Sequence, residues 1–134
     1  MPVKTTKSLV KGLRIAPRKV SLVASLIRGR SVADALVILQ HTPKRAALPL
    51  AKAIESAKAN ATANHGMLDK DLLIDSISVT AGPRLKRYRP AAHGRALPFQ
   101  RKTTHVVVVV SGEEKPKKAP AKTESKVTTK KESE

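Results

Sequence analysis

The first periodic apolar pattern in the chain follows Ala16-Pro17, and proline suits the first position of a helix. Apolar residues then recur at i, i+3, i+4 and i+7, which is the spacing of one helix face, at Val20, Val23, Ala24 and Ile27. Arg28-Gly29 supplies a basic last turn and a glycine stop. The pattern predicts a helix from Pro17 to about Arg28.

Two more helices are predicted between Ser31 and Gly66. Ser31 followed by Asp34 is an acidic variant of the capping box, and the apolar face after it consists of Val32, Ala35, Leu36 and Leu39. That helix is short, because Thr42-Pro43 resembles the cap and first position of a third helix running to His65. The apolar stripe of the third helix is Leu50, Ile54, Ala57 and Ala61. Pro49 removes one backbone donor and is expected to kink it modestly.

Beyond Gly66 the apolar period changes from helical to alternating. Ile77, Val79 and Ala81 alternate with Ser76, Ser78 and Thr80, as on a half-buried strand that Gly82-Pro83 ends or bends. The β-rich run Thr103–Val110 is long enough for a central strand. A weaker strand is predicted over Val3–Arg14, where Leu9, Leu13 and Ile15 alternate with polar residues. These patterns predict three helices and three strands, the first of which is the weakest.

The segment between the two later strands, residues 84–102, is too polar for a core and too long for an ordinary hairpin turn. It has seven basic and no acidic side chains, and it holds both aromatic residues of the chain, Tyr88 and Phe99. Aromatic rings among Arg and Lys can stack on bases while the cations hold phosphates. His93-Gly94 supplies a turn midway. A basic β-ribbon is expected; the alternatives are a solvated flexible loop, or a ribbon pinned by Tyr88 facing Phe99.

Composition agrees with a polyanionic partner. The 134 residues carry 27 Lys plus Arg against 10 Asp plus Glu, a formal net charge of +17, and nucleic acid is the expected neutraliser. All ten Arg lie before Glu113, whereas residues 113–134 form a Lys-rich tail that is expected to be disordered. Residues 1–112 are expected to form one domain. No apolar run is long enough to span a membrane and no secretory signal is present, so a cytoplasmic protein is expected.

Catalytic and metal-binding chemistry finds little support. The absence of cysteine excludes disulfides and thiolate sites. The histidines match no ligand motif by spacing, and they are His41, His65, His93 and His105. Asp69, Asp71 and Asp75 lack the later Gly and Glu of a calcium loop and are expected to form a solvated turn. A non-enzymatic protein without a cofactor is predicted.

Three blocks of the sequence resemble the L-twenty-two family of large-subunit ribosomal proteins. They are RIAPRKVSLVASLIRGRSVADAL, HTPKRAALPLAKAIESAKANATANHG and GPRLKRYRPAAHGRALPFQRKTTHVVVVVS, in this order. The resemblance covers roughly Leu9 to Ser111 and excludes the tail. It implies an α+β domain, with three helices on a small antiparallel sheet and a long projecting β-hairpin at about residues 82–104.

The resemblance also implies which residues contact ribosomal RNA. Arg14, Arg18 and Lys19 match a basic pattern of the family that is expected to contact the RNA backbone, unless they only solvate a helix terminus. The outgoing strand would present Arg84, Lys86, Arg87, Tyr88 and Arg89. The tip would present His93, Gly94 and Arg95, and the returning strand Arg101 and Lys102. Pro98 cannot donate to a ladder, so an irregular ribbon is expected around it.

The function implied is that of a structural ribosomal protein, which binds large-subunit RNA, assists assembly and lines the nascent-peptide exit tunnel with its hairpin. The partners implied are ribosomal RNA, neighbouring ribosomal proteins, and nascent peptides and tunnel-binding antibiotics at the tip; neither a membrane nor a homo-oligomer is expected. The alternative is a DNA-architectural protein with basic β-arms, for which Pro90 or Pro98 could act as a wedge. An enzyme acting on RNA would need convergent acids or a metal cluster, and neither is apparent.

Overall fold

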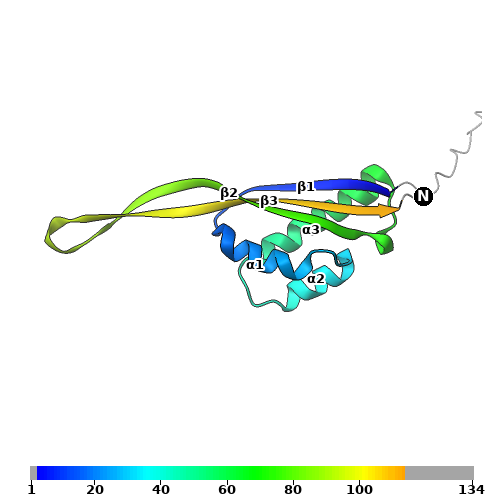
Figure 1. Ribbon diagram of the computed structural model, residues 1–134, viewed down its shortest axis with the longest axis horizontal. Coiled ribbons are helices and arrows are strands. Elements are labelled where there is room, and N and C mark those ends of the chain that lie inside the picture. The colour runs from blue at the N-terminus through cyan, green and yellow to red at the C-terminus, as the bar shows by residue number, and fades with distance from the viewer. Residues whose placement is uncertain (1–2, 114–134) are drawn as a thin grey trace, which may run out of the picture.

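The computed structural model describes residues 3–113, which form three helices on one face of a three-stranded antiparallel sheet (Figure 1). The strand order is β1-β3-β2. The elements are β1 (Val3–Leu13), α1 (Pro17–Ile27), α2 (Val32–His41), α3 (Ala47–His65), β2 (Leu73–Pro90) and β3 (Ala96–Glu113). Short 3-10 turns span Asp69–Asp71 and Ala92–Gly94. The predicted α+β class is confirmed, and the expected disorder of the tail concerns residues outside the described range, apart from Glu113 in β3.

The helix ends follow the expected capping chemistry. The Ser31 hydroxyl accepts the backbone N–H of Asp34 at 3.1 Å and donates to the Asp34 carboxylate at 2.8 Å, so one acidic residue completes the cap of α2. Gly66 ends α3 with a left-handed φ of 59°, and the Met67 N–H then donates back to the Ala61 carbonyl at 3.1 Å. Both caps satisfy backbone groups that a helix terminus otherwise leaves without partners.

The predicted start of the third helix is wrong. Thr42 closes α2 instead of opening α3: its N–H donates to the Leu39 carbonyl and its hydroxyl to the Ile38 carbonyl at 2.7 Å. A turn follows, and α3 begins at Ala47. Pro49 therefore occupies the first turn of α3, where a backbone N–H would have no partner within the helix, so it removes no intrahelical hydrogen bond and the reason for a kink disappears.

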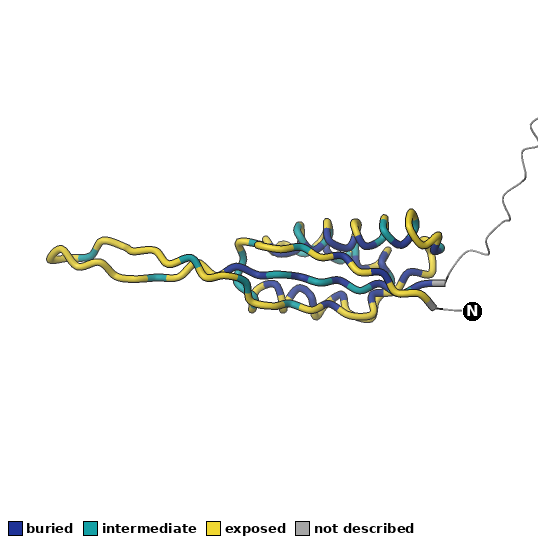
Figure 2. Tube along the Cα trace, turned by 90° about the horizontal axis from the view of Figure 1, so that it is seen from above, coloured by how far each residue is buried: buried dark blue, intermediate teal, exposed yellow. Residues whose placement is uncertain are grey.

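The core lies between the helices and the adjacent face of the sheet. β3 contributes Val106, Val108 and Val110, all fully buried, and the stripes of the three helices pack against them. On β1 the residues paired with these valines are Val10, Ser8 and Thr6, so β1 turns small and polar side chains inward. Leu9 is 53% exposed on the opposite face of the sheet, which no helix within residues 3–113 covers (Figure 2).

Beyond the body, β2 and β3 continue as a two-stranded arm that projects from one end (Figure 1). Their register shifts between Ala81 and Arg84 and then runs without a break from Arg84↔Lys102 to Pro90↔Ala96. β1 has its last pair at Thr104, so the arm begins where the third strand ends. Gly82-Pro83 thus bends the strand and does not end it. No helix within residues 3–113 is long and apolar enough to cross a membrane.

Candidate nucleic-acid interface

The two faces of the arm differ in chemistry. Paired residues of an antiparallel ladder point to the same face, and alternate residues point to opposite faces. The pairs Leu85↔Arg101, Arg87↔Phe99 and Arg89↔Leu97 define one face, which we call the arginine face. On it the guanidinium carbons of Arg89 and Arg101 lie 4.9 and 5.6 Å from the centroid of the Phe99 ring. The ring therefore holds two guanidinium groups through cation–π contacts.

The opposite face carries Tyr88, which is 69% exposed. Arg84 and Lys86 share this face, because they alternate with Tyr88 along the same strand. Lys102 shares it as well, because it is the ladder partner of Arg84. The alternative in which Tyr88 faces Phe99 across the strands is therefore wrong, since Tyr88 pairs with Pro98 and Phe99 pairs with Arg87. One aromatic ring is left for each face of the ribbon.

The irregularity expected around Pro98 is absent from the ladder, which stays in register there. Near the tip the Ala91 N–H donates to the Arg95 carbonyl at 2.8 Å, which makes Ala91 and Arg95 a hydrogen-bonded pair. Hydrogen-bonded and non-hydrogen-bonded pairs alternate along an antiparallel ladder. Pro90 and Pro98 consequently both lie in non-hydrogen-bonded pairs, where the nitrogen faces away from the partner strand. Because β1 does not reach this part of β3, a missing donor costs nothing.

The tip of the arm is a tight turn with two consecutive left-handed residues. His93 has a φ of 60° and Gly94 a φ of 68°, and His93 is the non-glycine residue with positive φ among residues 3–113. The Arg95 N–H donates to the Ala92 carbonyl at 3.5 Å and closes the turn. His93 and Arg95 are both exposed there. The tip is therefore narrow and presents two donor side chains.

A groove opens where the arm meets the body, with a volume of about 690 Å³. We call it the basal groove. Its basic lining residues come from four segments: Arg14 after β1, Lys19 in α1, Lys44 and Arg45 in the turn before α3, and Arg101 and Lys102 in β3. A smaller hollow beside it is shared by Arg14, Arg45, Arg87 and Arg101. Arg18 lines a separate hollow with Arg84 and Lys102.

The structure thus joins the two sets of basic residues predicted from sequence. The Arg14, Arg18 and Lys19 set lies against the base of the arm, next to Arg101 and Lys102. Lys86, Tyr88, Arg89, His93, Gly94 and Arg95 lie further out along the arm. Lys44 and Arg45 also line the basal groove but are not among the contacts predicted from sequence, because the pattern around Pro43 indicated only a helix start.

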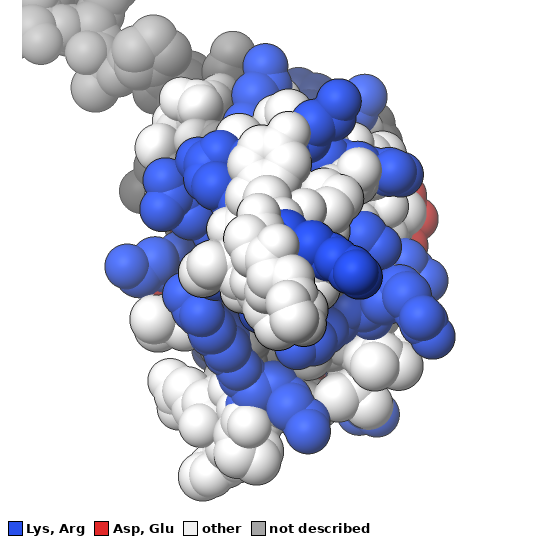
Figure 3. All heavy atoms as spheres, turned by 90° about the vertical axis from the view of Figure 1, so that its left-hand side faces the viewer, with Lys and Arg blue, Asp and Glu red and all other residues white. Residues whose placement is uncertain are grey.

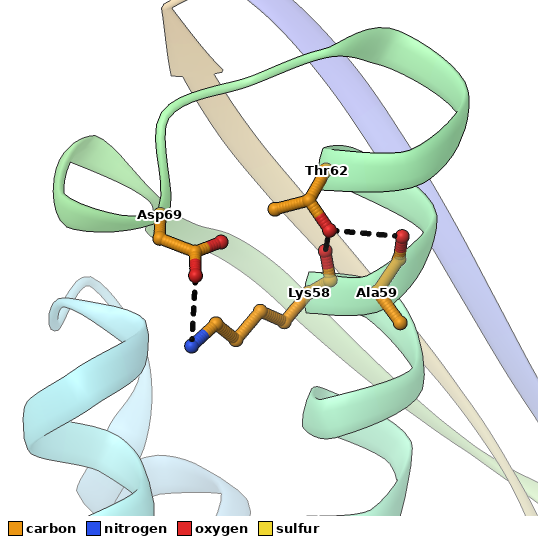
Figure 4. A network of polar contacts seen from close by, with 4 residues as sticks. All are labelled: Lys58, Ala59, Thr62 and Asp69. Atoms are coloured by element: carbon orange, nitrogen blue, oxygen red, sulfur yellow. Dashed lines mark hydrogen bonds and ion pairs between the residues drawn. The ribbon is translucent and has the colours of Figure 1, made fainter.

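The charged side chains at this end of the molecule are mainly basic. Viewed from the arm, Lys and Arg lie among uncharged residues over most of the surface, and Asp or Glu is visible mainly at the right-hand edge (Figure 3). None of the basic residues lining the basal groove forms an ion pair with a carboxylate of the part of the chain that the structure describes. The ion pair between Lys58 and Asp69, at 3.3 Å, lies in the body beside α3 (Figure 4). Asp69 and Asp71 belong to the exposed turn that precedes β2, as expected, whereas Asp75, which was predicted to lie in the same turn, is part of β2.

Clustered like charges without counterions repel one another in the folded chain, and a bound polyanion removes that repulsion. Six cations line one groove and are continued by an arm with cations on both faces, so the basic surface is extended. In a comparison with known protein families, the family model described as Ribosomal protein L22p/L17e matches residues 8–111.

Proposed function

The chain belongs to the L22p/L17e family of ribosomal proteins, and from that premise we propose that its arm and basal groove bind large-subunit ribosomal RNA and that the arm reaches the nascent-peptide exit tunnel. The family is a structural, non-enzymatic one, and the protein is a structural constituent of the ribosome. Assistance in subunit assembly, in the cytoplasm and beside neighbouring ribosomal proteins, is part of the same proposal.

The observation that carries RNA binding is the convergence of basic side chains from four segments on the basal groove. Arg guanidinium groups match phosphate oxygens in a bidentate manner. Segments that are far apart in the sequence can then contact different parts of an RNA at once. Such a protein stabilises a folded RNA by holding several of its strands together.

The arm has the proportions of an element that inserts between RNA helices. Seven residue pairs follow the register shift, and at about 3.4 Å per residue they extend the arm by roughly 20 Å before the tip. The arm is two strands thick, and nearly all of it is exposed (Figure 2). A structure this thin has little core of its own, so an RNA partner would supply the contacts that fix it.

We assign anchoring to the arginines of the ladder and tunnel contact to the tip of the arm. Arg84 begins the ladder beside the body, Arg87 lies midway and Arg89 lies one pair before its outer end, so all three precede the tip turn. The tip, residues 91–95, has small residues and a glycine that allow close approach to a wall, with His93 and Arg95 as donors. Nascent peptides and tunnel-binding antibiotics would meet these tip residues.

The test compares a tip variant with a base variant in cells that lack the wild-type copy. The tip variant combines Arg95→Ala with deletion of Ala92-His93, and the base variant replaces Arg84, Arg87 and Arg89 by Ala. Sedimentation should place the tip variant in large subunits with altered sensitivity to tunnel-binding antibiotics, while the base variant should accumulate outside subunits. Equal assembly defects, or unchanged antibiotic sensitivity of the tip variant, would contradict this division.

The DNA-architectural alternative is less well supported. A wedge that kinks duplex DNA is an apolar side chain at the leading end of an arm. Here Pro90 and Pro98 both lie within the ladder, and the turn itself carries Ala92, His93 and Gly94. Co-sedimentation of the protein with the nucleoid instead of with ribosomal subunits would favour this alternative.

A further inference from the structure

Part of the basal groove is lined by apolar side chains, which we call its floor and which phosphate groups would not contact. Leu22 and Leu26 lie one turn apart on α1, both line the groove, and they are 72% and 49% exposed. Val23 and Ala46, which are buried, complete the apolar floor. Large aliphatic side chains at this exposure cost free energy in water, because apolar surface is stabilised when it is removed from solvent. The pair indicates an occupant with an apolar surface.

The rim of the same groove specifies the charge of that occupant. Six cationic side chains line the groove together with the leucines, and within residues 3–113 no acidic residue does. The volume of about 690 Å³ lies within the range of sites that enclose a small organic molecule, about 300–1,000 Å³. The occupant therefore combines a compact apolar part with more than one negative charge around it.

We propose that the basal groove binds a single unpaired nucleotide of RNA, with the base against Leu22 and Leu26 and the flanking phosphates on the basic rim. This inference rests on the proposed function and states which structural feature of the RNA the groove selects. A nucleotide within an A-form duplex presents phosphates and 2′-hydroxyl groups while its base remains stacked, so it cannot cover the leucines. An unpaired nucleotide presents both a base face and two phosphates.

An acidic amphipathic segment of a neighbouring protein would also meet cations and leucines. The rim favours RNA because three of its six cations are Arg, whose planar fork fits phosphate bidentately and also stacks on bases. Arg14, Arg45 and Arg101 come from separate segments and line the same groove as Leu22 and Leu26. This arrangement suits a backbone that passes over the groove with a phosphate on either side of the base.

The first experiment detects the base directly. The full chain, labelled with ¹³C in its leucine methyl groups, is titrated with a short single-stranded oligouridylate that carries one central adenine. A base lying on the leucines should shift the methyl resonances of Leu22 and Leu26 through its ring current. The same RNA with an abasic central position, inorganic polyphosphate and an RNA duplex should each leave these resonances nearly unchanged. Leu48, 67% exposed on α3 and outside the groove, is the internal reference.

The second experiment measures affinity. Replacing Leu22 and Leu26 together by Ala keeps every charge and retains good helix formers. The double variant should bind the single-stranded RNA about five- to twentyfold more weakly, because it loses apolar contact area with one base. Binding of the duplex should change less than about twofold, because electrostatic contacts to its backbone are retained. Leu48→Ala is the matched control and should bind both RNAs as the unmodified protein does.

The outcomes separate this inference from the function on which it rests. If the double variant binds single-stranded RNA as well as the unmodified chain, or duplex shifts Leu22 and Leu26 equally, the nucleotide pocket is refuted while RNA binding stands. If poly-glutamate shifts these methyls more strongly than the RNA does, the groove is a protein-docking site. If neither the single-stranded RNA nor the duplex binds at all, both the nucleotide pocket and the proposed RNA-binding function are refuted.

Discussion

Phe99 should determine how firmly the arginine face holds RNA without contributing any charge itself. Its ring lies 4.9 Å from the guanidinium carbon of Arg89 and 5.6 Å from that of Arg101. A cation–π contact at an exposed site is worth about 0.5–1 kcal/mol. Replacing Phe99 by Leu keeps the size and apolar character of the side chain and removes both contacts. The variant therefore loses about 1–2 kcal/mol of cation–π interaction that holds the two guanidinium groups in place.

That free energy should appear in the affinity for RNA. Since about 1.4 kcal/mol corresponds to a factor of ten in a binding constant, Phe99→Leu should weaken binding roughly five- to thirtyfold. The dependence of log K on log salt should stay the same, because its slope counts the phosphates neutralised and no cation has been removed. Arg101→Ala should instead reduce the slope by about 0.7–0.9, the contribution of one phosphate contact.

The measurement is fluorescence anisotropy of labelled RNA at a series of salt concentrations, on the full chain. Leu97→Ala is the control. Leu97 lies on the same face of the arm and is 58% exposed, but it has no aromatic ring and so makes no cation–π contact. It should leave both affinity and slope close to their original values. Unchanged affinity of Phe99→Leu, or a slope that falls as it does for Arg101→Ala, would refute the positioning role of the ring.

Three further predictions concern the architecture. Replacing Leu85–Arg101 by a short turn should preserve helical circular dichroism and change the free energy of unfolding in urea by less than about 1 kcal/mol, because the buried core lies outside this range; loss of cooperative unfolding would show that the arm belongs to the core. Ser31→Ala should destabilise the protein by about 1 kcal/mol in the same assay, since it removes the hydroxyl that caps α2, whereas Ser31→Asp should restore most of it. Gly82→Ala should lower the free energy of unfolding by about 1–3 kcal/mol, because the new Cβ would lie 2.5 Å from the Thr103 hydroxyl oxygen. That hydroxyl donates to the Pro83 carbonyl. A melting temperature equal to that of the unmodified protein would contradict the close approach.

Much of the fold could be predicted because it is encoded locally. Helix ends are set by residues within one turn of the helix concerned, as at Pro17, the Ser31–Asp34 pair and Gly66. A short stretch of sequence is therefore enough to predict their roles. The error at Thr42-Pro43 has a local cause as well. The same residue types that cap the start of a helix can donate back to the carbonyls at the end of one, and Thr42 does so at 2.7 Å.

Strand orientation was harder to predict, because period two defines two faces but not which face is covered. Leu9 and Val10 alternate equally well in either sense, and the register with Val106 and Val107 decides that Val10 turns inward. In the arm both faces are solvated, so apolar alternation carries no information there. The opposite placement of Tyr88 and Phe99 follows only from the ladder that pairs them with Pro98 and Arg87.

Sequence alone was enough to identify the helix stripes, the basic arm with both aromatic residues, and the family resemblance, because each depends on residues that are close together in the chain. The basal groove depends on the tertiary fold. Arg14, Arg45 and Arg101 are separated by dozens of residues and meet because β1 ends, α3 begins and the arm leaves the sheet at one end of the body. Chain topology brings such residues together. Their charged side chains do not pack in the core, so they produce no periodic apolar pattern in the sequence.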